Sequence, residues 1–125
     1  GESLARCHFR DGLQRWMALA QQVNRYIDAK APWKAIRTDQ QDAATSLWVC
    51  ANALSCLATV TYPYLPFSSQ RLHDMLGFSG ETQARGWTVP PVPGGQPIPK
   101  PEPLFTKLEA PISEADIPHP ATKAR

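Results

Sequence analysis

A tryptophan at a helix break, among basic residues, is the first chemistry that this sequence offers. The stretch NRYIDAKAPWKAIRTD, residues 24–39, ends a helix-like run at Pro32 and places Trp33 directly behind it. Proline limits backbone freedom, so a ring held in this way would lose little entropy when it binds a flat partner. Unpaired nucleic-acid bases stack on aromatic rings while basic side chains hold the phosphates. The basic residues around the pair are Arg25, Lys30, Lys34 and Arg37.

The alternative for Trp33 is a core residue that closes the end of the helix, because large aromatic side chains are usually buried. Residues 1–38 carry seven Lys/Arg against three Asp/Glu, although the whole chain has a net charge of only +2. This local excess favours an anionic partner. A solvated helix face would show the same excess, so spacing and charge leave both interpretations open.

No catalytic or metal-binding pattern accompanies the tryptophan. The sequence contains no P-loop, GxGxxG, GxSxG or HExxH motif. Asn24 and Asp28 lie four residues apart and share one helix face, which is more typical of a hydrogen-bonding cluster than of an acid–base pair. The histidines are scattered, so we expect no metal site. These features predict a binding or structural module without catalytic residues.

Cysteine usage and hydropathy indicate the compartment. Cys7, Cys50 and Cys56 form no disulfide framework, and an odd number of cysteines favours free thiols in a reducing compartment, hence a cytoplasmic protein. Cys50 and Cys56 lie in an apolar helical pattern, so we expect both to be buried. We find no signal peptide, and we expect no apolar run to be long enough to span a membrane.

The element that leads to Trp33 is a predicted amphipathic helix over residues 3–30. Its N-cap is expected at Ser3, and Pro32 ends it, because the proline ring clashes with the preceding helical turn and moves Ala31 out of the helical region. Asp11 and Arg15 form an expected i,i+4 ion pair. Apolar residues at three- and four-residue steps define its core face: Phe9, Leu13, Trp16, Met17, Ala20, Val23 and Ile27.

Two further helices are predicted behind the tryptophan. One spans 39–61, and a capping-box pattern at Thr38 and Gln41 marks its start. A short one spans about 67–76, with Gly77 in the C′ position that follows a helix end. Many apolar residues of the helix over 39–61 are small, so we expect a neighbouring helix to pack closely against it.

Composition changes abruptly after these helices, because ten of the thirteen prolines lie in 90–120. We therefore predict an all-α helical bundle over 1–78 and an irregular Pro/Gly-rich segment over 79–110. Residues 111–125 are expected to form a tail or linker. The segment is expected to dock back onto the helices through PLFTKLE, residues 103–109.

The motif VNRYIDAKAPWK closely resembles the anticodon-binding domain of methionyl-tRNA synthetases, which are class I aminoacyl-tRNA synthetases. The resemblance covers about residues 5–78, including YPYLPFSSQRLHDMLG, and resumes at PEPLFTKLE. It implies a helical bundle of the class I anticodon-binding type. It also implies that Trp33 stacks on an anticodon base and that Pro32 shapes the pocket. The expected supporting or phosphate-contacting residues are Asn24, Arg25, Asp28, Lys30, Lys34 and Arg37.

The resemblance further implies what accompanies this domain. The family's bundle has a helix upstream of residue 1, and a catalytic domain belongs to the same parent chain. That domain joins methionine to its tRNA through methionyl-adenylate, using ATP and magnesium, with zinc as an open option. No cofactor and no membrane contact are expected for these residues. The expected partner is the anticodon loop of the tRNA for methionine.

Two alternatives stay open at this point. One is a structural helical module that docks onto a larger protein without touching RNA; a buried Trp33 ring would favour it. The other is the equivalent domain of a cysteine or arginine synthetase, which the AKAPWK turn opposes. We also expect an exposed apolar groove between the helices over 3–30 and 39–61, covered in solution by self-association or by the proline-rich tail folding back. The residues expected around this groove are Leu4, Leu19, Tyr26, Trp48, Val49 and Leu57.

Overall fold

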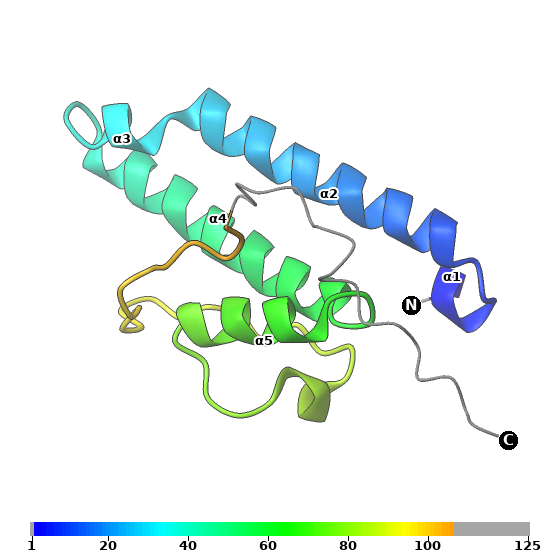
Figure 1. Ribbon diagram of the computed structural model, residues 1–125. Helices are drawn as coiled ribbons and strands as arrows, with labels where there is room; N and C mark the ends of the chain where they lie inside the picture. The colour runs from blue at the N-terminus through cyan, green and yellow to red at the C-terminus, as the bar shows by residue number, and fades with distance from the viewer. Residues whose placement is uncertain (1, 107–125) are drawn as a thin grey trace, which may run out of the picture.

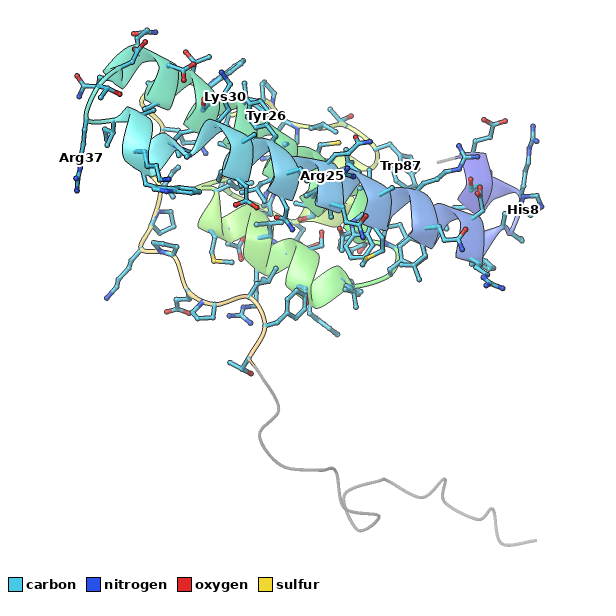
Figure 2. All side chains as sticks on the ribbon, turned by 90° about the horizontal axis from the view of Figure 1, so that it is seen from above. His8, Arg25, Tyr26, Lys30, Arg37 and Trp87 are labelled. Atoms are coloured by element: carbon cyan, nitrogen blue, oxygen red, sulfur yellow. The ribbon has the colours of Figure 1, made fainter. Side chains whose placement is uncertain are left out.

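The computed structural model describes residues 2–106, whose regular elements are all helical (Figure 1). They are α1 (Glu2–Ala5), α2 (Phe9–Lys30), α3 (Pro32–Ala35), α4 (Gln40–Thr61), α5 (Pro66–Met75) and the 3-10 helix η1 (Thr82–Arg85). Figure 1 shows α2 beside α4, with α3 joining them at one end. In Figure 2, Arg37 lies at this α3 end and His8 at the opposite end. The predicted all-α class is confirmed.

Helix α4 is the centre of the bundle and contacts α2, α3 and α5. Its buried apolar residues are mostly small, which lets the neighbouring helices approach closely; they are Ala43, Cys50, Leu57 and Ala58. The N-cap of the helix is Asp39, whose carboxylate accepts a hydrogen bond from the Asp42 N–H at 3.0 Å. The predicted cap at Thr38 is therefore wrong by one residue, and the Thr38 hydroxyl instead donates to the Ala35 carbonyl at 3.3 Å.

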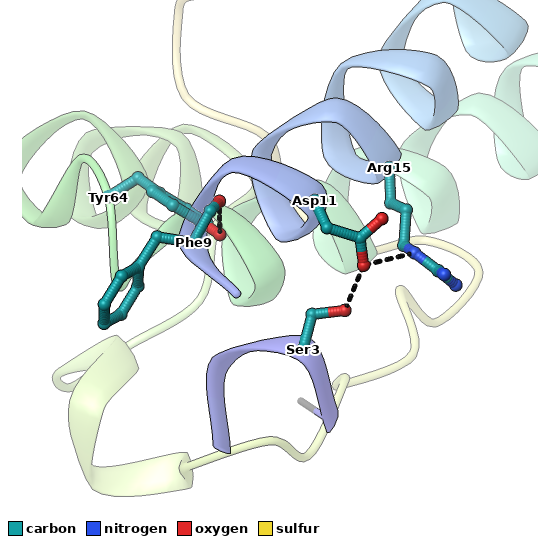
Figure 3. A network of polar contacts seen from close by, with 5 residues as sticks. All are labelled: Ser3, Phe9, Asp11, Arg15 and Tyr64. Atoms are coloured by element: carbon teal, nitrogen blue, oxygen red, sulfur yellow. Dashed lines mark hydrogen bonds and ion pairs between the residues drawn. The ribbon is translucent and has the colours of Figure 1, made fainter. Parts of the chain in front are cut away.

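The predicted single helix over 3–30 is wrong at its start. The chain leaves α1 at Ala5, turns at Cys7 with φ 58°, and starts α2 at Phe9. Ser3 consequently lies inside α1 and does not cap the long helix. Its hydroxyl donates instead to Asp11 Oδ2 at 2.7 Å (Figure 3). The break separates the four-residue α1 from the long α2, which periodicity alone had merged.

The packed face of α2 also differs from the predicted one. No residue of α2 is fully buried, and Phe9, Leu13 and Met17 are 58%, 40% and 46% exposed. The partly buried large residues of the helix are Trp16, Leu19, Val23, Tyr26 and Ile27. Four of the seven predicted residues therefore face the bundle, and three do not, because the helix is rotated toward the side that carries Leu19 and Tyr26.

Helix α5 was predicted over 67–76 and is observed one residue earlier at both ends. Gly77 follows it with φ 80°, as expected for the C′ glycine. The helix is held to α4 by Ser69, a buried residue whose hydroxyl donates to the Ala58 carbonyl. The buried His73 ring stacks on Phe78, with centroids 5.1 Å apart.

Hydrogen bonds fix the Pro/Gly-rich segment to α4. Ser55 Oγ donates to the Pro90 carbonyl at 2.6 Å. Val92 is buried, and its carbonyl accepts from Trp48 Nε1 while its N–H donates to Asn52 Oδ1, both at 3.0 Å. The sequence had predicted that the proline-rich tail could fold back onto the helices, but it could not indicate these hydrogen bonds, because they depend on backbone groups.

The PLFTKLE motif contacts α5 through its first residues. Arg71 donates to the Pro103 and Leu104 carbonyls at 3.3 and 3.2 Å, while residues 107–109 of the motif lie outside the described residues. The division of the chain at residues 78 and 110 stays a prediction.

Helix α4 is the one helix in residues 2–106 that is long and apolar enough to cross a membrane, with a mean hydropathy of 1.5. The expectation that no apolar run would be long enough is therefore wrong. Length and composition are weak indicators, however, because the central helix of a bundle passes the same test. The contacts of α4 with three other helices account for its apolar composition.

Candidate nucleic-acid interface

Trp33 stands on a sharp turn between α2 and α4. Lys30 ends α2, and Ala31 adopts the left-handed conformation, with φ 40° and ψ 59°. A residue with a Cβ atom is disfavoured there by about 1–2 kcal/mol. Pro32 then begins α3 at the position where its missing N–H is no loss. The predicted helix end at Pro32 is confirmed, whereas the short α3 was missed.

The two residues of the turn motif differ in burial. Pro32 is buried, and Trp33 beside it is 55% exposed. The proline therefore anchors the turn in the bundle while more than half of the indole surface faces solvent. This exposure contradicts the interpretation of Trp33 as a core residue.

Ile36 extends the exposed apolar surface and was missed by the sequence analysis. It follows Trp33 by three residues and is 53% exposed. Residues three apart in a helical turn lie on the same side, so that spacing was the signal that could have identified it. A large exposed apolar pair at the tip of a bundle favours a binding surface over a solvated one.

Lys30, Lys34 and Arg37 lie at this tip, whereas Arg25 lies further back along α2 (Figure 2). Arg25, Lys34 and Arg37 are exposed, and none of them forms an ion pair within the described part of the chain. Lys30 differs, because its Nζ donates to Asp42 Oδ1 at 3.1 Å. That hydrogen bond raises the pKa of Lys30 above its ordinary value. Asp42 is a second residue of this end that sequence reasoning missed.

Asn24 and Asp28 lie exposed on α2, four residues apart, as expected for one shared face. Among residues 2–106, no hydrogen bond joins Asn24, Arg25 or Asp28 to the turn that carries Trp33. Their side chains therefore do not brace the turn through hydrogen bonds within the described residues.

A cleft of about 520 Å³ lies at the opposite end of the molecule, between α1, α2, Val60, Tyr64 and Trp87. Leu4 and Leu19 line it, as expected for the predicted groove, but charged side chains line it as well. The remaining groove residues do not belong to this cleft: Leu57 is buried, and Trp48 hydrogen-bonds the Pro/Gly-rich segment. The groove prediction is therefore only partly correct.

All three cysteines are free thiols. Cys7 is exposed and Cys50 is buried, and burial raises the pKa of the Cys50 thiol. Cys56 is only partly buried, which corrects the expectation for that residue. Within the described residues, no three His, Cys, Asp or Glu side chains gather in a metal-binding arrangement.

Comparison with known proteins places this geometry in a family. Residues 2–116 match the profile of the anticodon binding domain of methionyl tRNA ligase. A methionine–tRNA ligase from Dehalococcoides mccartyi is 47% identical over 115 residues, which are 92% of this chain and 21% of that protein. Those of a Roseiflexus species and of Chloroflexus aggregans are 37% and 35% identical, covering 93% and 94% of this chain.

The chain spans between a fifth and a quarter of the length of these relatives, namely 21%, 24% and 24%. The match covers α1 to α5 and the turn that presents Trp33. By the extent of the profile match and the identity to these ligases, the chain belongs to the family of methionyl-tRNA ligase anticodon-binding domains.

Proposed function

We propose that this chain binds the anticodon loop of the tRNA for methionine and that Trp33 stacks on one of the anticodon bases. The exposure of Trp33 beside the buried Pro32 carries the proposal. A ring whose backbone is already fixed loses little freedom when a base stacks on it. Base stacking on an aromatic side chain contributes roughly 1–3 kcal/mol.

Basic and polar side chains around the ring would hold the rest of the loop. Arg25, Lys34 and Arg37 are exposed, and no acid pairs with them in the described part of the chain, so they are available to RNA phosphates. The polar face of Asn24 and Asp28 lies on α2, next to Arg25 in sequence. We assign this face to the approach of the anticodon loop along α2.

The chemistry of the longer ligase is assigned to parts of the protein outside these residues. We propose that this domain, over residues 1–78 with the Pro/Gly-rich segment over 79–110, acts in cis with a catalytic domain. That domain would attach methionine to the tRNA with ATP and magnesium, and zinc remains an option for it. A cytoplasmic location accords with the three free thiols.

Titration with a methionine anticodon stem-loop tests the proposal. The chain should bind this RNA more tightly than a stem-loop of the same length with a changed anticodon, because only stacking and base-edge contacts distinguish the two. Equal affinity for the two RNAs would show phosphate binding alone. Absence of binding to either would favour the structural helical module.

A further inference from the structure

The contact between Lys30 and Asp42 closes the base of the turn that carries Trp33. Lys30 is the last residue of α2, and Asp42 lies in the first turn of α4. Their side chains meet at 3.1 Å across twelve residues of chain. All of α3, including Trp33, lies between the two partners, so the contact ties together the two ends of the turn.

Asp42 is also part of the cap of α4. Its main-chain N–H donates to the Asp39 carboxylate at 3.0 Å, and the Asp39 N–H donates to the Ala35 carbonyl at 2.7 Å. The same residue therefore connects the end of α3, through Asp39, and the end of α2, through Lys30.

The backbone of this turn needs such support. Ala31 is held in the left-handed region, with φ 40°, although it is not a glycine. A residue stays in this conformation only when its surroundings fix it, and such residues cluster at functional sites. The supports on either side of it are the Ile27 carbonyl, which accepts the Ala31 N–H at 2.9 Å, and the buried Pro32.

We propose that Asp42 is a positioning residue for anticodon binding, which acts by holding Lys30 and thereby the orientation of the Trp33 turn. The inference rests on the proposed function. It assigns Lys30 a positioning role in place of phosphate contact, since the lysine charge is already neutralised by an acid. The Lys30 and Asp42 side chains are 43% and 41% exposed, so the pair contributes little to global stability.

The direction in which Asp42→Ala changes RNA affinity distinguishes a positioning role of Asp42 from simple charge repulsion. An acidic residue near RNA repels phosphates, so its removal should tighten binding if charge alone matters. If Asp42 orients the turn, Asp42→Ala should instead weaken binding of the methionine anticodon stem-loop about two- to fivefold, the range expected for the loss of an exposed ion pair.

The chain offers a matched control at its other end. Asp11 is also a first-turn aspartate, 44% exposed, and accepts from Arg15 at 3.0 Å. Asp11→Ala removes the same charge and the same kind of pair, far from Trp33. It should leave RNA affinity unchanged or slightly raise it, so a loss common to both variants would overturn the proposal.

Two further variants test Lys30 itself. If Lys30 contacts a phosphate, Lys30→Ala should flatten the dependence of log affinity on log salt by about 0.7. If Lys30 acts through Asp42, the slope should stay the same while affinity falls. Exchanging the pair (Lys30→Asp with Asp42→Lys) should recover part of the affinity that either single substitution loses, and an additive loss would contradict the proposal.

A measurement without RNA tests whether Asp42 orients the Trp33 turn, independently of whether the chain binds an anticodon loop. With 5-fluorotryptophan incorporated and the Trp33 signal assigned by Trp33→Phe, Asp42→Ala should shift or broaden the Trp33 fluorine resonance and leave the others in place. An unchanged Trp33 resonance would refute positioning even if RNA binds. If that resonance shifts but Trp33→Ala leaves RNA affinity unchanged, the proposed function fails and the role of Asp42 in anticodon binding fails with it.

Discussion

The two ends of α2 are built from similar parts. Each has a non-glycine residue with positive φ, Cys7 before the helix and Ala31 after it, at 58° and 40°. Each also has an exposed tryptophan: Trp87 lines the cleft beside α1, and Trp33 stands on α3, and they are 53% and 55% exposed. An exposed indole alone therefore does not distinguish a nucleic-acid site from any other surface.

Charge distinguishes the two ends. At the α1 end, two of the three arginines form ion pairs, Arg6 with Glu2 and Arg15 with Asp11, and the exposed Arg10 forms none within the described residues. At the α3 end, as far as residues 2–106 show, only Lys30 has an acidic partner, and the other bases there are available to an anion. A ring near bases that are mostly paired with acids suits a structural contact, whereas a ring near bases that mostly lack acidic partners suits a polyanion.

The largest expected effect is a loss of RNA affinity when the Trp33 ring, but not the Trp87 ring, is removed. Trp33→Ala should weaken binding of the methionine anticodon stem-loop by roughly 1–3 kcal/mol, because one stacking platform is lost. Helical content by circular dichroism should stay nearly unchanged, since the ring is exposed. Trp87→Ala is the matched control and should leave RNA affinity as it is.

Two outcomes would contradict the different roles assigned to the Trp33 and Trp87 rings. If Trp33→Ala unfolds the domain, the ring is a core residue and the stacking assignment is wrong. If the two alanine variants lose RNA affinity equally, both rings belong to one binding surface and the charge difference between the ends is irrelevant.

A smaller effect is expected from glycine at the two strained positions. Ala31→Gly and Cys7→Gly each remove left-handed strain of about 1–2 kcal/mol and add about 0.5–1 kcal/mol of backbone entropy to the unfolded chain. Each should therefore raise the free energy of unfolding slightly, as measured by urea denaturation. Only Ala31→Gly should also lower RNA affinity, because it loosens the turn that holds Trp33. Equal RNA affinity of both variants would show that the turn is held without the help of Ala31.

The smallest effect concerns pH at the α1 end. Hydrogen bonds from Ser3 and then from Arg15 lower the pKa of Asp11 below 3.8 (Figure 3). A carboxyl group with a lowered folded-state pKa stabilises the fold above its unfolded pKa, and this stabilisation is lost as pH falls through the lower value. Acid should therefore release α1 from α2 before the bundle unfolds. NMR signals of Ser3 and Asp11 should report this release together, and Asp11→Asn should abolish the pH dependence.

The sequence identified the parts of the fold that depend on local chemistry. Pro32 ends α2 because a proline ring excludes a continuing helix, and Gly77 ends α5 because it tolerates positive φ. The exposure of Trp33 could not be obtained in this way, since a helix end can place a ring either inward or outward. The family resemblance indicated the ring as a stacking platform, and the structure then showed it to be accessible.

Non-local pairings escaped the sequence analysis. The contact between Lys30 and Asp42 spans twelve residues, and no spacing rule links a helix end to the start of the next helix. The packed side of α2 was likewise misjudged at Phe9 and Met17, because periodicity gives a stripe but not the rotation of the helix toward its neighbours.

The way in which the bundle holds its Pro/Gly-rich segment has a consequence for sequence variation. Ser55, Trp48 and Arg71 donate to main-chain carbonyls of that segment, which every amino acid possesses. The path of the segment is therefore set by the helices, and its exposed side chains are free to change as long as the backbone can follow the same course. The exceptions include Val92 and Thr82, whose side chains are buried, and Gln96, whose side-chain amide donates to the Leu76 carbonyl. Substitutions at Ser55 or Trp48 should consequently be tolerated far less than substitutions at the exposed Pro91 or Pro93.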